Sequence, residues 1–508
     1  MAIINSIFGW FIKKRIHQIE LFVKYPHDVQ HEWFNRLVKT ASSTEFGKRY
    51  GFSDIQTPEQ YKPRVPVRDY EGFKADIDRI IKGEQNILWP SEIRMFAKSS
   101  GTTSDKSKFI PVSQESLEEC HYKGGKDLLS LYYNEFPDSR LMEGRGLAMG
   151  GSSDFVPMNE SSYYGDLSAI IIKNLPFWAA LHRTPDTSVA LNPSWEEKIE
   201  QIAQITIQQN ITNISGVPSW MLVLLRRILE ISGKSHIKEV WPNLEWYVHG
   251  GVSFTPYRQA FEEVIGGNGT MRYSETYNAS EGFFGIQDSV KATDMLLMLD
   301  YGIFFEFMPM DQLGQDNPKT LLLHEVETGV NYALVITTNG GLWRYLIGDS
   351  IVFTSTSPYR IKVSGRTKHF INVFGEEVIV DNAERALAQA CEFCQARVKE
   401  YTVAPVFMDN KKAGAHEWAI EFEKQPEDLE KFCEKLDSAL MSVNSDYEAK
   451  RKGDRVLRKP MIRAVRPGTF YEWMKQRGKL GGQNKVPRLS NDRKHLEQII
   501  EISNRLNA

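Results

Sequence analysis

The chain has 508 residues, of which 41% are hydrophobic and 25% are charged, and its formal net charge is −3. Its length and apolar content predict a globular protein of roughly two to four domains. The near-neutral charge argues against general nucleic-acid binding, which usually requires a basic excess over a whole domain. Four cysteines are too few for a disulfide framework, so we expect a reducing compartment, the cytoplasm.

The N-terminal segment carries apolar residues at helical spacing, which predicts an amphipathic helix docked on the body of the protein. Contact with a membrane interface is the alternative. No uninterrupted span of about 20 apolar residues is present, so we expect no transmembrane segment. The apolar positions are Ile4, Ile7, Phe8, Phe11, Ile12, Ile16, Ile19 and Val23.

Further along the chain, the pattern divides the protein into two domains. Helical and strand patterns alternate over residues 27–240, which predicts α/β layers, and β-rich runs over 295–364 predict a barrel-like subdomain. A compact α+β unit follows, with an expected helix over 381–400, a strand over 416–423 and a helix over 427–443. We therefore expect a large N-terminal domain of the α/β class, 1–367, and a small C-terminal domain, 368–508.

Two features of the C-terminal domain favour structural over chemical roles. Cys391 and Cys394 form a C-x-x-C pair within a helical pattern, without a second cysteine pair or a histidine cluster. They are interpreted as two half-buried helix cysteines and not as zinc ligands. The basic run from Lys450 to Lys459 is interpreted as a solvated face or a loop beside a hinge.

The stretch from Ser99 to Pro111 reads SSGTTSDKSKFIP and has the composition of a phosphate-binding loop. Its hydroxyl groups can donate to phosphate oxygens, its glycine allows close approach of the backbone, and a lysine can neutralise charge. An ordinary surface turn is the alternative. The donors are Ser99, Ser100, Thr102 and Thr103, the glycine is Gly101, and the lysine is Lys106 or Lys108.

Two later motifs add chemistry that suits a nucleotide. Tyr277-Asn278-Ala279-Ser280-Glu281 offers a ring for a purine, a hydroxyl for a phosphate and a carboxylate for Mg²⁺. The segment from Tyr345 to Asp349 ends in Gly-Asp, where a carboxylate can accept both hydroxyls of a ribose. The alternatives are a core tyrosine at 277, a solvated loop carboxylate at 281 and a hairpin-turn aspartate at 349.

The order of these motifs, completed by Gly365-Arg366-Thr367-Lys368, resembles the adenylate-forming superfamily. The segments SSGTTSDKSKFIPV, VHGGVSF, YNASEGFFG, GLWRYLIGD, GRTKHFINVFGEE and GGQNKVPR are together similar to the bacterial branch of the acyl-acid amido synthetases, the auxin-responsive-promoter family. The resemblance runs from about Phe46 to Arg488.

The resemblance implies a reaction in which a carboxylic acid attacks the α-phosphate of ATP, and an amine, such as an amino acid, then attacks the acyl-adenylate. ATP and Mg²⁺ are the implied cofactors. Lys485 is the implied mobile lysine, with Lys479 as a rival, and Lys368 is the implied hinge. The implied ATP contacts are Ser99, Ser100, Gly101, Thr102, Thr103, Gly250, Gly251, Tyr277, Asn278, Ser280, Asp349 and Arg366; Glu281 would hold the metal, and Lys108, Glu281 and Lys485 would be catalytic.

The sequence departs from plant members at two positions. Asp105 replaces a loop glycine, and Leu346 stands where those members have arginine, although Arg344 lies beside it. An acyl pocket is expected from the 115–135 helix, the 150–155 loop and the 211–224 strand and helix, with Tyr122, Phe155, Val217, Trp220 and Met221 as lining residues. These side chains do not specify the acid.

Two other functions remain open from the sequence. One is an adenylate-forming ligase whose acceptor is a thiol, either coenzyme A or a carrier protein. The other is a nucleotide-binding protein without turnover, although Glu281, Asp349 and the late lysine are all present. The expected partners are small molecules, and the protein is expected to be a monomer.

Overall fold

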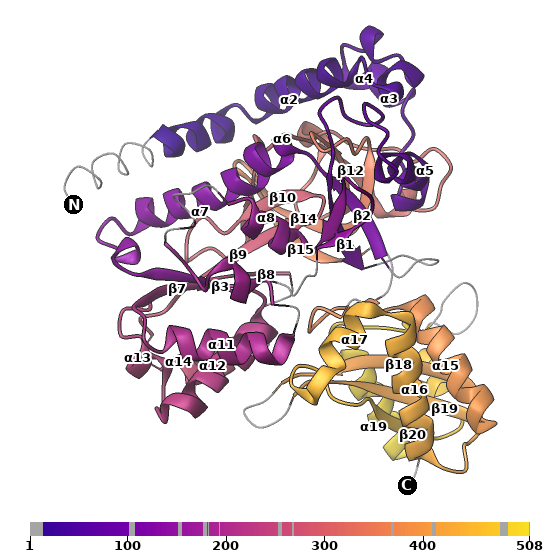
Figure 1. Cartoon of the computed structure of the whole chain (residues 1–508). Coiled ribbons are helices and arrows are strands. Elements are labelled where there is room, and N and C mark those ends of the chain that lie inside the picture. Colours follow the sequence, from indigo (N-terminus) through magenta and orange to yellow (C-terminus); the bar gives the residue numbers. More distant parts are fainter. Residues whose placement is uncertain are drawn as a thin grey trace.

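The computed structural model describes residues 14–506, apart from 101–106, 151–154, 176–179, 181, 193, 252–253, 255–256, 267–268, 367–369, 377, 409–412 and 478–485. Residues 14–366, the large unit, run from indigo to orange in Figure 1, and residues 370–506, the small unit, lie at the lower right. Within these described ranges, no helix is long and apolar enough to cross a bilayer.

An eleven-stranded sheet forms the centre of the large unit, in the order β12-β13-β14-β15-β11-β10-β9-β8-β7-β3-β6. At one end of the sheet, the neighbouring strands β6, β3, β7, β8 and β9 pair in parallel. From β9 through β10 to the other end at β12, neighbouring strands pair antiparallel. The sheet thus changes character at β9. The strands are β3 (Arg145–Ala148), β6 (Arg183–Thr184), β7 (Ile211–Ser215), β8 (Trp246–Gly250), β9 (Arg272–Ala279), β10 (Gly282–Ile286), β11 (Met295–Leu297), β12 (Ile303–Pro309), β13 (Asn331–Thr338), β14 (Tyr345–Thr356) and β15 (Tyr359–Arg366).

The antiparallel half of this sheet is strongly curled. The Tyr277 hydroxyl on β9 donates to Asp349 Oδ2 on β14 at 2.6 Å. The two strands are four steps apart in the sheet, which would separate them by about 19 Å if the sheet were flat. The predicted β-rich segment therefore continues the central sheet and bends it over, in keeping with the barrel-like expectation.

Helices cover the faces of the sheet (Figure 1). Helix α12 illustrates why they form where they do: Pro218 opens its first turn, and Gly233 ends it in the left-handed conformation at φ 67°. The helices are α2 (Pro26–Ala41), α3 (Glu45–Arg49), α4 (Pro58–Tyr61), α5 (Tyr70–Ile81), α6 (Gln114–Ser116), α7 (Tyr122–Glu135), α8 (Leu167–Lys173), α10 (Thr187–Ala190), α11 (Trp195–Thr206), α12 (Pro218–Ser232), α13 (Ile237–Val240) and α14 (Arg258–Ile265).

The N-terminal helix packs on the large unit as predicted over its described part, residues 14–24. Ile19 and Phe22 are buried in the main core. Arg15 adds an ion pair with the buried Asp127 and a second with Asp300 at 2.8 Å. The expected positions from Ile4 to Ile12 lie outside the described residues.

A second sheet, in the order β2-β1-β5-β4, carries the predicted phosphate loop. Strands β1 and β2 form an antiparallel hairpin in which Ser99 pairs with Lys108 and Ser100 with Ser107. The segment between them is the hairpin connection. The strands are β1 (Met95–Ser100), β2 (Ser107–Val112), β4 (Val156–Pro157) and β5 (Tyr163–Gly165).

The small unit is a three-stranded sheet, β18-β19-β20, between two pairs of helices. The expected helix over 381–400 is wrong at its end. Gln395 takes the left-handed conformation at φ 50° and stops the helix, and the following run joins the sheet. The elements are β16 (Phe370–Ile371), β17 (Val378–Ile379), α15 (Val380–Cys394), β18 (Arg397–Val406), β19 (Ala415–Lys424), α16 (Leu429–Val443), α17 (Ser445–Arg451), β20 (Met461–Val465), α18 (Thr469–Gln476) and α19 (Lys494–Arg505).

The half-buried helix positions predicted for the C-x-x-C pair are confirmed. Cys391 and Cys394 lie half-buried on α15 as free thiols. Burial raises the pKa of both thiols, which disfavours the thiolate needed for metal binding. The predicted boundary between residues 367 and 368 falls outside the described residues, between β15 and β16.

Candidate functional site

The site begins at the carboxyl ends of the parallel strands. Gly216 follows β7, Gly250 ends β8 with Gly251 directly after it, and Glu281 lies in the turn after β9. Parallel strands place these ends at one edge of the sheet, where α/β proteins commonly bind ligands. A side chain on Gly250 would lie 2.5 Å from the Thr276 carbonyl oxygen, so only glycine lets β8 and β9 approach as they do.

Two tyrosine–carboxylate pairs join the predicted nucleotide motifs reciprocally. Tyr277 of the first motif donates to Asp349 of the second at 2.6 Å. Tyr345 of the second motif donates to Glu281 Oε1 of the first at 3.3 Å. Burial, and then the Glu281 charge, raise the pKa of Tyr345 well above its usual value, so its hydroxyl stays a donor. Each motif therefore positions the carboxylate of the other.

The environment of Tyr277 bears on its predicted contact with a purine. Its ring packs against Phe284, with 4.8 Å between centroids, and the residue is only 7% exposed. Its hydroxyl is engaged by Asp349, so the structure shows Tyr277 as a support for that carboxylate. Stacking of a purine on this ring stays a prediction. Asn278 is exposed, and Ser280 is half-buried beside Glu281.

Asp349 lies at a bend of β14 that glycine permits. Gly348 takes a positive φ of 95° immediately before it. Asp349 also faces Arg366 across the β14–β15 ladder. Two residues predicted from separate motifs are therefore cross-strand neighbours. A hairpin-turn aspartate is excluded for position 349, since this residue lies inside a strand.

Arg344 does not supply the cation that plant members place after the tyrosine. It is 4% exposed and takes a left-handed φ of 46°. Its guanidinium bonds Glu306 Oε2 at 3.0 Å and the Val65 carbonyl oxygen at 2.7 Å. Arg344 is thus paired inside the core, and the half-buried Leu346 leaves this position without a charge.

The predicted phosphate loop is only partly described. Ser99 is half-buried on β1, and Lys108 is 7% exposed directly opposite it on β2. Gly101, Thr102, Thr103 and Asp105 lie outside the described residues, as does Lys106. Ser100 is described only as the last residue of β1. The hairpin nevertheless fixes both ends of the loop.

A histidine that the sequence reading missed lies against the first motif. Residues Leu117–His121 form a single π-helical turn, an irregularity that is frequent at functional sites. His121 is 6% exposed and hydrogen-bonds the Asn278 side chain, while burial lowers its pKa to about 4. The neighbouring Cys120 sulfur accepts from the Phe283 backbone N–H at 3.1 Å. The π turn therefore aligns two consecutive side chains with the β9–β10 hairpin.

The residues predicted for an acyl pocket fall into two groups. Tyr122 donates to the Asn174 carbonyl oxygen at 2.7 Å after α8, and Phe155 lies beneath the Lys173 ammonium of α8 at 4.1 Å. Val217, Trp220 and Met221 lie together at the start of α12, with Met221 fully buried. The described residues alone do not join the two groups into one cavity.

Of the two interpretations of the basic run, a solvated face is wrong for its first two residues. Lys450 is half-buried, with its Nζ 4.2 Å from the centre of the Trp220 ring in the large unit. Arg451 pairs with Asp437 at 2.6 Å in the small unit. A tertiary contact and an ion pair override the tendency of a basic segment to face solvent. Lys452 and Arg455 are exposed as expected.

The implied lysines and hinge, Lys479, Lys485 and Lys368, lie outside the described residues. The segment directly after Lys485 is fixed on the small sheet. Thr402 Oγ1 donates to the Pro487 carbonyl oxygen at 2.6 Å, and Val403 N–H donates to the Arg488 carbonyl oxygen at 2.9 Å. The residues that follow Lys485 therefore belong to the small unit.

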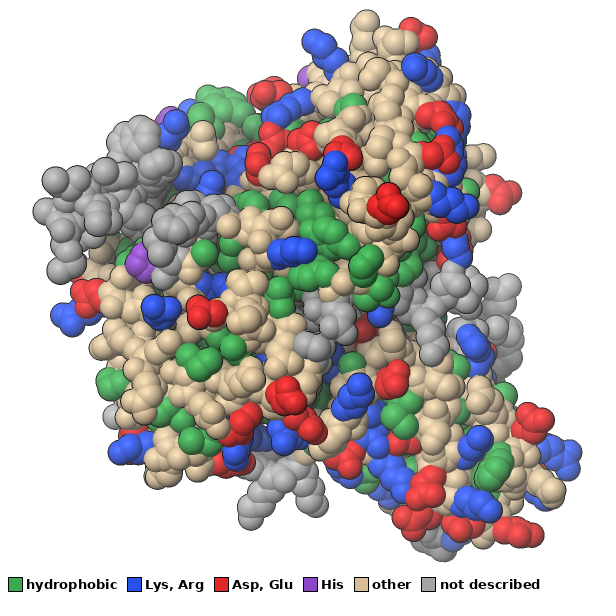
Figure 2. Space-filling model, in the orientation of Figure 1, with side chains coloured by type: hydrophobic (Ala, Val, Ile, Leu, Met, Phe, Trp, Pro, Cys, Tyr) green, Lys and Arg blue, Asp and Glu red, His purple; other side chains and the backbone are tan. Residues whose placement is uncertain are grey.

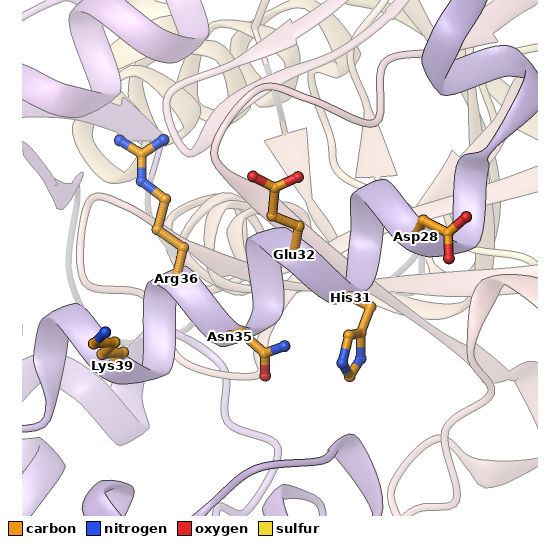
Figure 3. A pocket seen from close by; sticks show the side chains of 6 residues that line it. All are labelled: Asp28, His31, Glu32, Asn35, Arg36 and Lys39. Atoms are coloured by element: carbon orange, nitrogen blue, oxygen red, sulfur yellow. The ribbon is translucent and has the colours of Figure 1, made fainter.

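A separate hollow runs along helix α2 and does not belong to the site. Figure 3 shows its lining residues along the helix. They are Asp28, His31, Glu32, Asn35, Arg36 and Lys39. None of the predicted site residues is among them, and a depression bounded by a single exposed helix face lacks the enclosure that a small-molecule site needs.

The donor set suits a single magnesium ion better than a protein-only metal centre. In the part of the chain that is described, no group of three or more His, Cys, Asp or Glu side chains could hold a metal. Mg²⁺ commonly uses one or two carboxylates together with the phosphates of its substrate. Glu281, half-buried at the carboxyl end of β9 and bonded by Tyr345, fits that requirement.

Comparisons with known proteins identify the family of this chain. The GH3 family models match the chain over 15–270 (N-terminal domain), 296–366 (central domain) and 381–494 (C-terminal domain). The indole-3-acetic acid-amido synthetase GH3.4 of Arabidopsis thaliana is 27% identical, with 94% of this chain and 91% of that protein covered.

Two solved structures show the same fold. One is the GH3.15 acyl acid amido synthetase, with a TM-score of 0.61 at 18% identity, covering 96% of this chain and 95% of that one. The other is a 2-hydroxyisobutyryl-CoA ligase in complex with 2-HIB-AMP and CoA, with a TM-score of 0.56 at 12% identity, covering 94% and 92%. Matches to the N-terminal, central and C-terminal domain models together show that this chain belongs to the GH3 family.

Proposed function

We propose that this protein is an ATP-dependent acyl-acid amido synthetase. It activates a carboxylic acid as an acyl-adenylate and transfers the acyl group to an amine, with an amino acid as the expected acceptor, giving an amide, AMP and pyrophosphate. The observation that carries the proposal is the reciprocal pairing of Tyr277 with Asp349 and of Tyr345 with Glu281. These pairs bring Asp349, which we propose binds ribose, and Glu281, which we propose holds magnesium, to the same part of the central sheet.

The first step brings together two anions, the carboxylate and the triphosphate, so catalysis depends on positioning and on positive charge. Asp349, held by Tyr277, accepts the ribose hydroxyls of ATP. Hydroxyl and amide groups at the β1–β2 hairpin, with Ser99 at its base, bind the β- and γ-phosphates. Gly250 and Gly251 let the backbone at the end of β8 approach the nucleotide.

Glu281 is the residue that would hold magnesium. When bound, Mg²⁺ would neutralise phosphate charge and orient the oxygens of ATP. Tyr345 keeps the Glu281 carboxylate in place by donating a hydrogen bond to it.

We infer that the small unit moves between the two steps. Lys485, with Lys479 as the alternative, would reach the α-phosphate during adenylation and then withdraw as the unit turns about Lys368. The anchoring of Pro487 and Arg488 on β18 supports this, because the lysine must travel with that sheet. Lys368→Pro should damage amide formation more than adenylation, and equal loss in both steps would contradict the hinge.

The group that accepts the acyl chain distinguishes the proposed amido synthetase from a ligase that forms a thioester. The name of the Arabidopsis relative describes an amido synthetase, and it supports an amine acceptor here. A thiol acceptor is the second candidate, since the chain also shares its fold with a CoA ligase. We propose a cytoplasmic, monomeric enzyme for small-molecule acids, whose acyl pocket draws on Tyr122, Phe155, Val217, Trp220 and Met221.

A screen for pyrophosphate release over carboxylic acids, with ATP and hydroxylamine as trapping amine, tests the proposal. We expect one class of acid to give acid-dependent release and a hydroxamate. Productive acids are then supplied with amino acids or with coenzyme A, and the product is identified by mass spectrometry. An amide supports the synthetase, a thioester supports the rival, and no release with any acid contradicts both.

A further inference from the structure

A lysine of the small unit contacts a tryptophan of the large unit at the junction between them. Lys450 lies in the last turn of helix α17, and its Nζ lies 4.2 Å from the ring centre of Trp220 in the first turn of α12. An ammonium over an indole face is attracted by the ring quadrupole, and more strongly when water is excluded. Lys450 is half-buried, so part of this contact is shielded from solvent.

The backbone of the small unit is shaped around this contact. Gly375 has a positive φ of 86°, and a side chain there would lie 3.3 Å from Lys450 Cε and 3.8 Å from Trp220 Cζ2. Absence of a side chain at 375 lets the lysine stem pass between the backbone and the tryptophan ring. Three segments that are distant in the sequence therefore meet at Lys450.

A second contact ties the same segment to the large unit. The Tyr257 hydroxyl donates to the Val373 carbonyl oxygen at 2.7 Å. Within the small unit, Glu376 accepts from Phe374 N–H at 2.6 Å and pairs with His416 Nε2 at 2.8 Å. Glu376 and His416 are both fully buried, so the segment from Val373 to Glu376 is firmly held where it meets the large unit.

The charges around Lys450 come from both units. Burial lowers the pKa of Lys450, whereas Asp446 one turn earlier, Asp166 of the large unit and Glu376 raise it. Asp166 also faces Lys198, which is fully buried and donates to the Gly150 carbonyl oxygen at 3.2 Å. Acidic groups of both units therefore act on the Lys450 ammonium. Figure 2 shows acidic and basic side chains on the surface where the two units meet.

We propose that Lys450 is a positioning residue: seated on Trp220, it latches the small unit in the present arrangement and so sets the balance between the two half-reactions. The inference rests on the proposed function, in which the small unit turns about Lys368. Any such rotation must separate Lys450 from Trp220 and Tyr257 from Val373. Trp220 also belongs to the predicted acyl pocket. The acyl group and Lys450 of the small unit would therefore contact the same indole ring.

The latch is tested on the full-length chain without substrate. Spin labels are placed at Lys234→Cys and Glu427→Cys, both exposed, in a background with Cys391→Ser and Cys394→Ser. We expect one dominant distance for the parent, and a second population after Lys450→Met, with the docked fraction relative to the open one reduced about tenfold. Lys450→Arg should retain the parent distribution, and Lys452→Met, at an exposed lysine two residues further on, is the matched control.

The catalytic consequence is measured on the same variants. With a productive acid, Lys450→Met should change the rate of acyl transfer from preformed adenylate about tenfold relative to ATP–pyrophosphate exchange, because loss of the latch shifts the balance between the two arrangements. Trp220→Phe, which keeps an aromatic face, should have a smaller effect. An unchanged distance distribution, or equal loss in both steps, overturns the latch.

The two proposals can fail separately. If no acid supports pyrophosphate exchange in the parent protein, the proposed function fails, while the distance measurement still decides whether Lys450 holds the units together. If exchange and amide formation are normal in Lys450→Met and the distances do not change, the function stands and the latch is wrong.

Discussion

The cluster of tyrosines and carboxylates and the junction at Lys450 are two regions of one proposed site, and they differ in how their residues are specified. Tyr277, Glu281, Tyr345 and Asp349 come from two short motifs, each built around a strand end, and the curl of one sheet brings them together. Lys450, Gly375 and Trp220 belong to no shared pattern and meet only through packing of the two units. Local chemistry therefore shows in the sequence, whereas contacts between units do not.

We expect the largest effect from Arg344→Met, which tests whether a residue beside a predicted nucleotide motif has a purely structural role. Arg344→Met leaves Glu306, which is 1% exposed, without its guanidinium partner. Breaking such a buried pair should lower the free energy of unfolding by about 3–5 kcal/mol. Urea unfolding measures this loss. Arg36→Met removes an exposed arginine from another ion pair and should cost under about 1 kcal/mol.

If Arg344→Met were as stable as the parent and impaired only ATP use, Arg344 would act at the site. The distinction between motif residues that act and those that support the fold would then fail.

Glu281→Gln should have the largest effect on chemistry. The substitution keeps the size of the side chain and its ability to accept from Tyr345, but it removes the charge that would hold magnesium. We expect ATP–pyrophosphate exchange to fall about 10²–10³-fold with little change in unfolding free energy. Raising the magnesium concentration should recover part of the rate. Parent-like exchange in this variant would remove Glu281 from the site.

The next largest expected effect is the pH dependence that His121 gives to the free energy of unfolding. Its pKa of about 4 in the folded protein lies below the value of 6.5 for an exposed histidine, because burial disfavours the charged ring. The unfolded chain therefore binds the proton first as pH falls, and stability is lost from pH 6.5 down to about pH 4, by up to about 3 kcal/mol.

Urea unfolding of the parent and of His121→Gln over this pH range isolates the contribution, since every other ionisable residue is the same in both proteins. The difference in unfolding free energy should change with pH. A constant difference would show that His121 is not a buried neutral imidazole.

The smallest expected effects compare the two tyrosine bonds. Tyr277→Phe removes a 2.6 Å bond to Asp349, and Tyr345→Phe removes a 3.3 Å bond to Glu281. A shorter bond to a charged group is worth more, so we expect the KM for ATP to rise about tenfold in the first variant and about two- to threefold in the second. The reverse order would mean that the Glu281 support matters more than the ribose support.

The sequence predicted the parts of the fold that rest on local patterns. Alternating helices and strands, the half-buried cysteines of α15 and the carboxylates of the two motifs follow from periodicity and residue chemistry. The end of α15 did not, because Gln395 is an ordinary residue forced into a left-handed conformation where the chain turns back to β18. Nothing in the local sequence distinguishes it from a helical position.

Individual residues of the candidate site could be predicted from the sequence, but the contacts between them could not. Tyr277 was expected to face a purine, and the structure engages its hydroxyl with Asp349. His121 has no motif of its own, because its role depends on a π turn that aligns it with Asn278. Lys450 was expected on a solvated face or in a loop beside a hinge, because a basic run is usually solvated and the tryptophan beneath it lies far away in the sequence.

Transfer of a labelled oxygen tests the central claim, formation of an acyl-adenylate at this site, most directly. A productive acid is labelled with ¹⁸O in its carboxylate and allowed to react with ATP and the amine, and the AMP formed is examined by mass spectrometry. We predict that one ¹⁸O atom from the acid appears in the phosphate of AMP, and that Glu281→Gln slows this transfer in parallel with exchange. AMP without label, formed while the amide accumulates, would contradict the account.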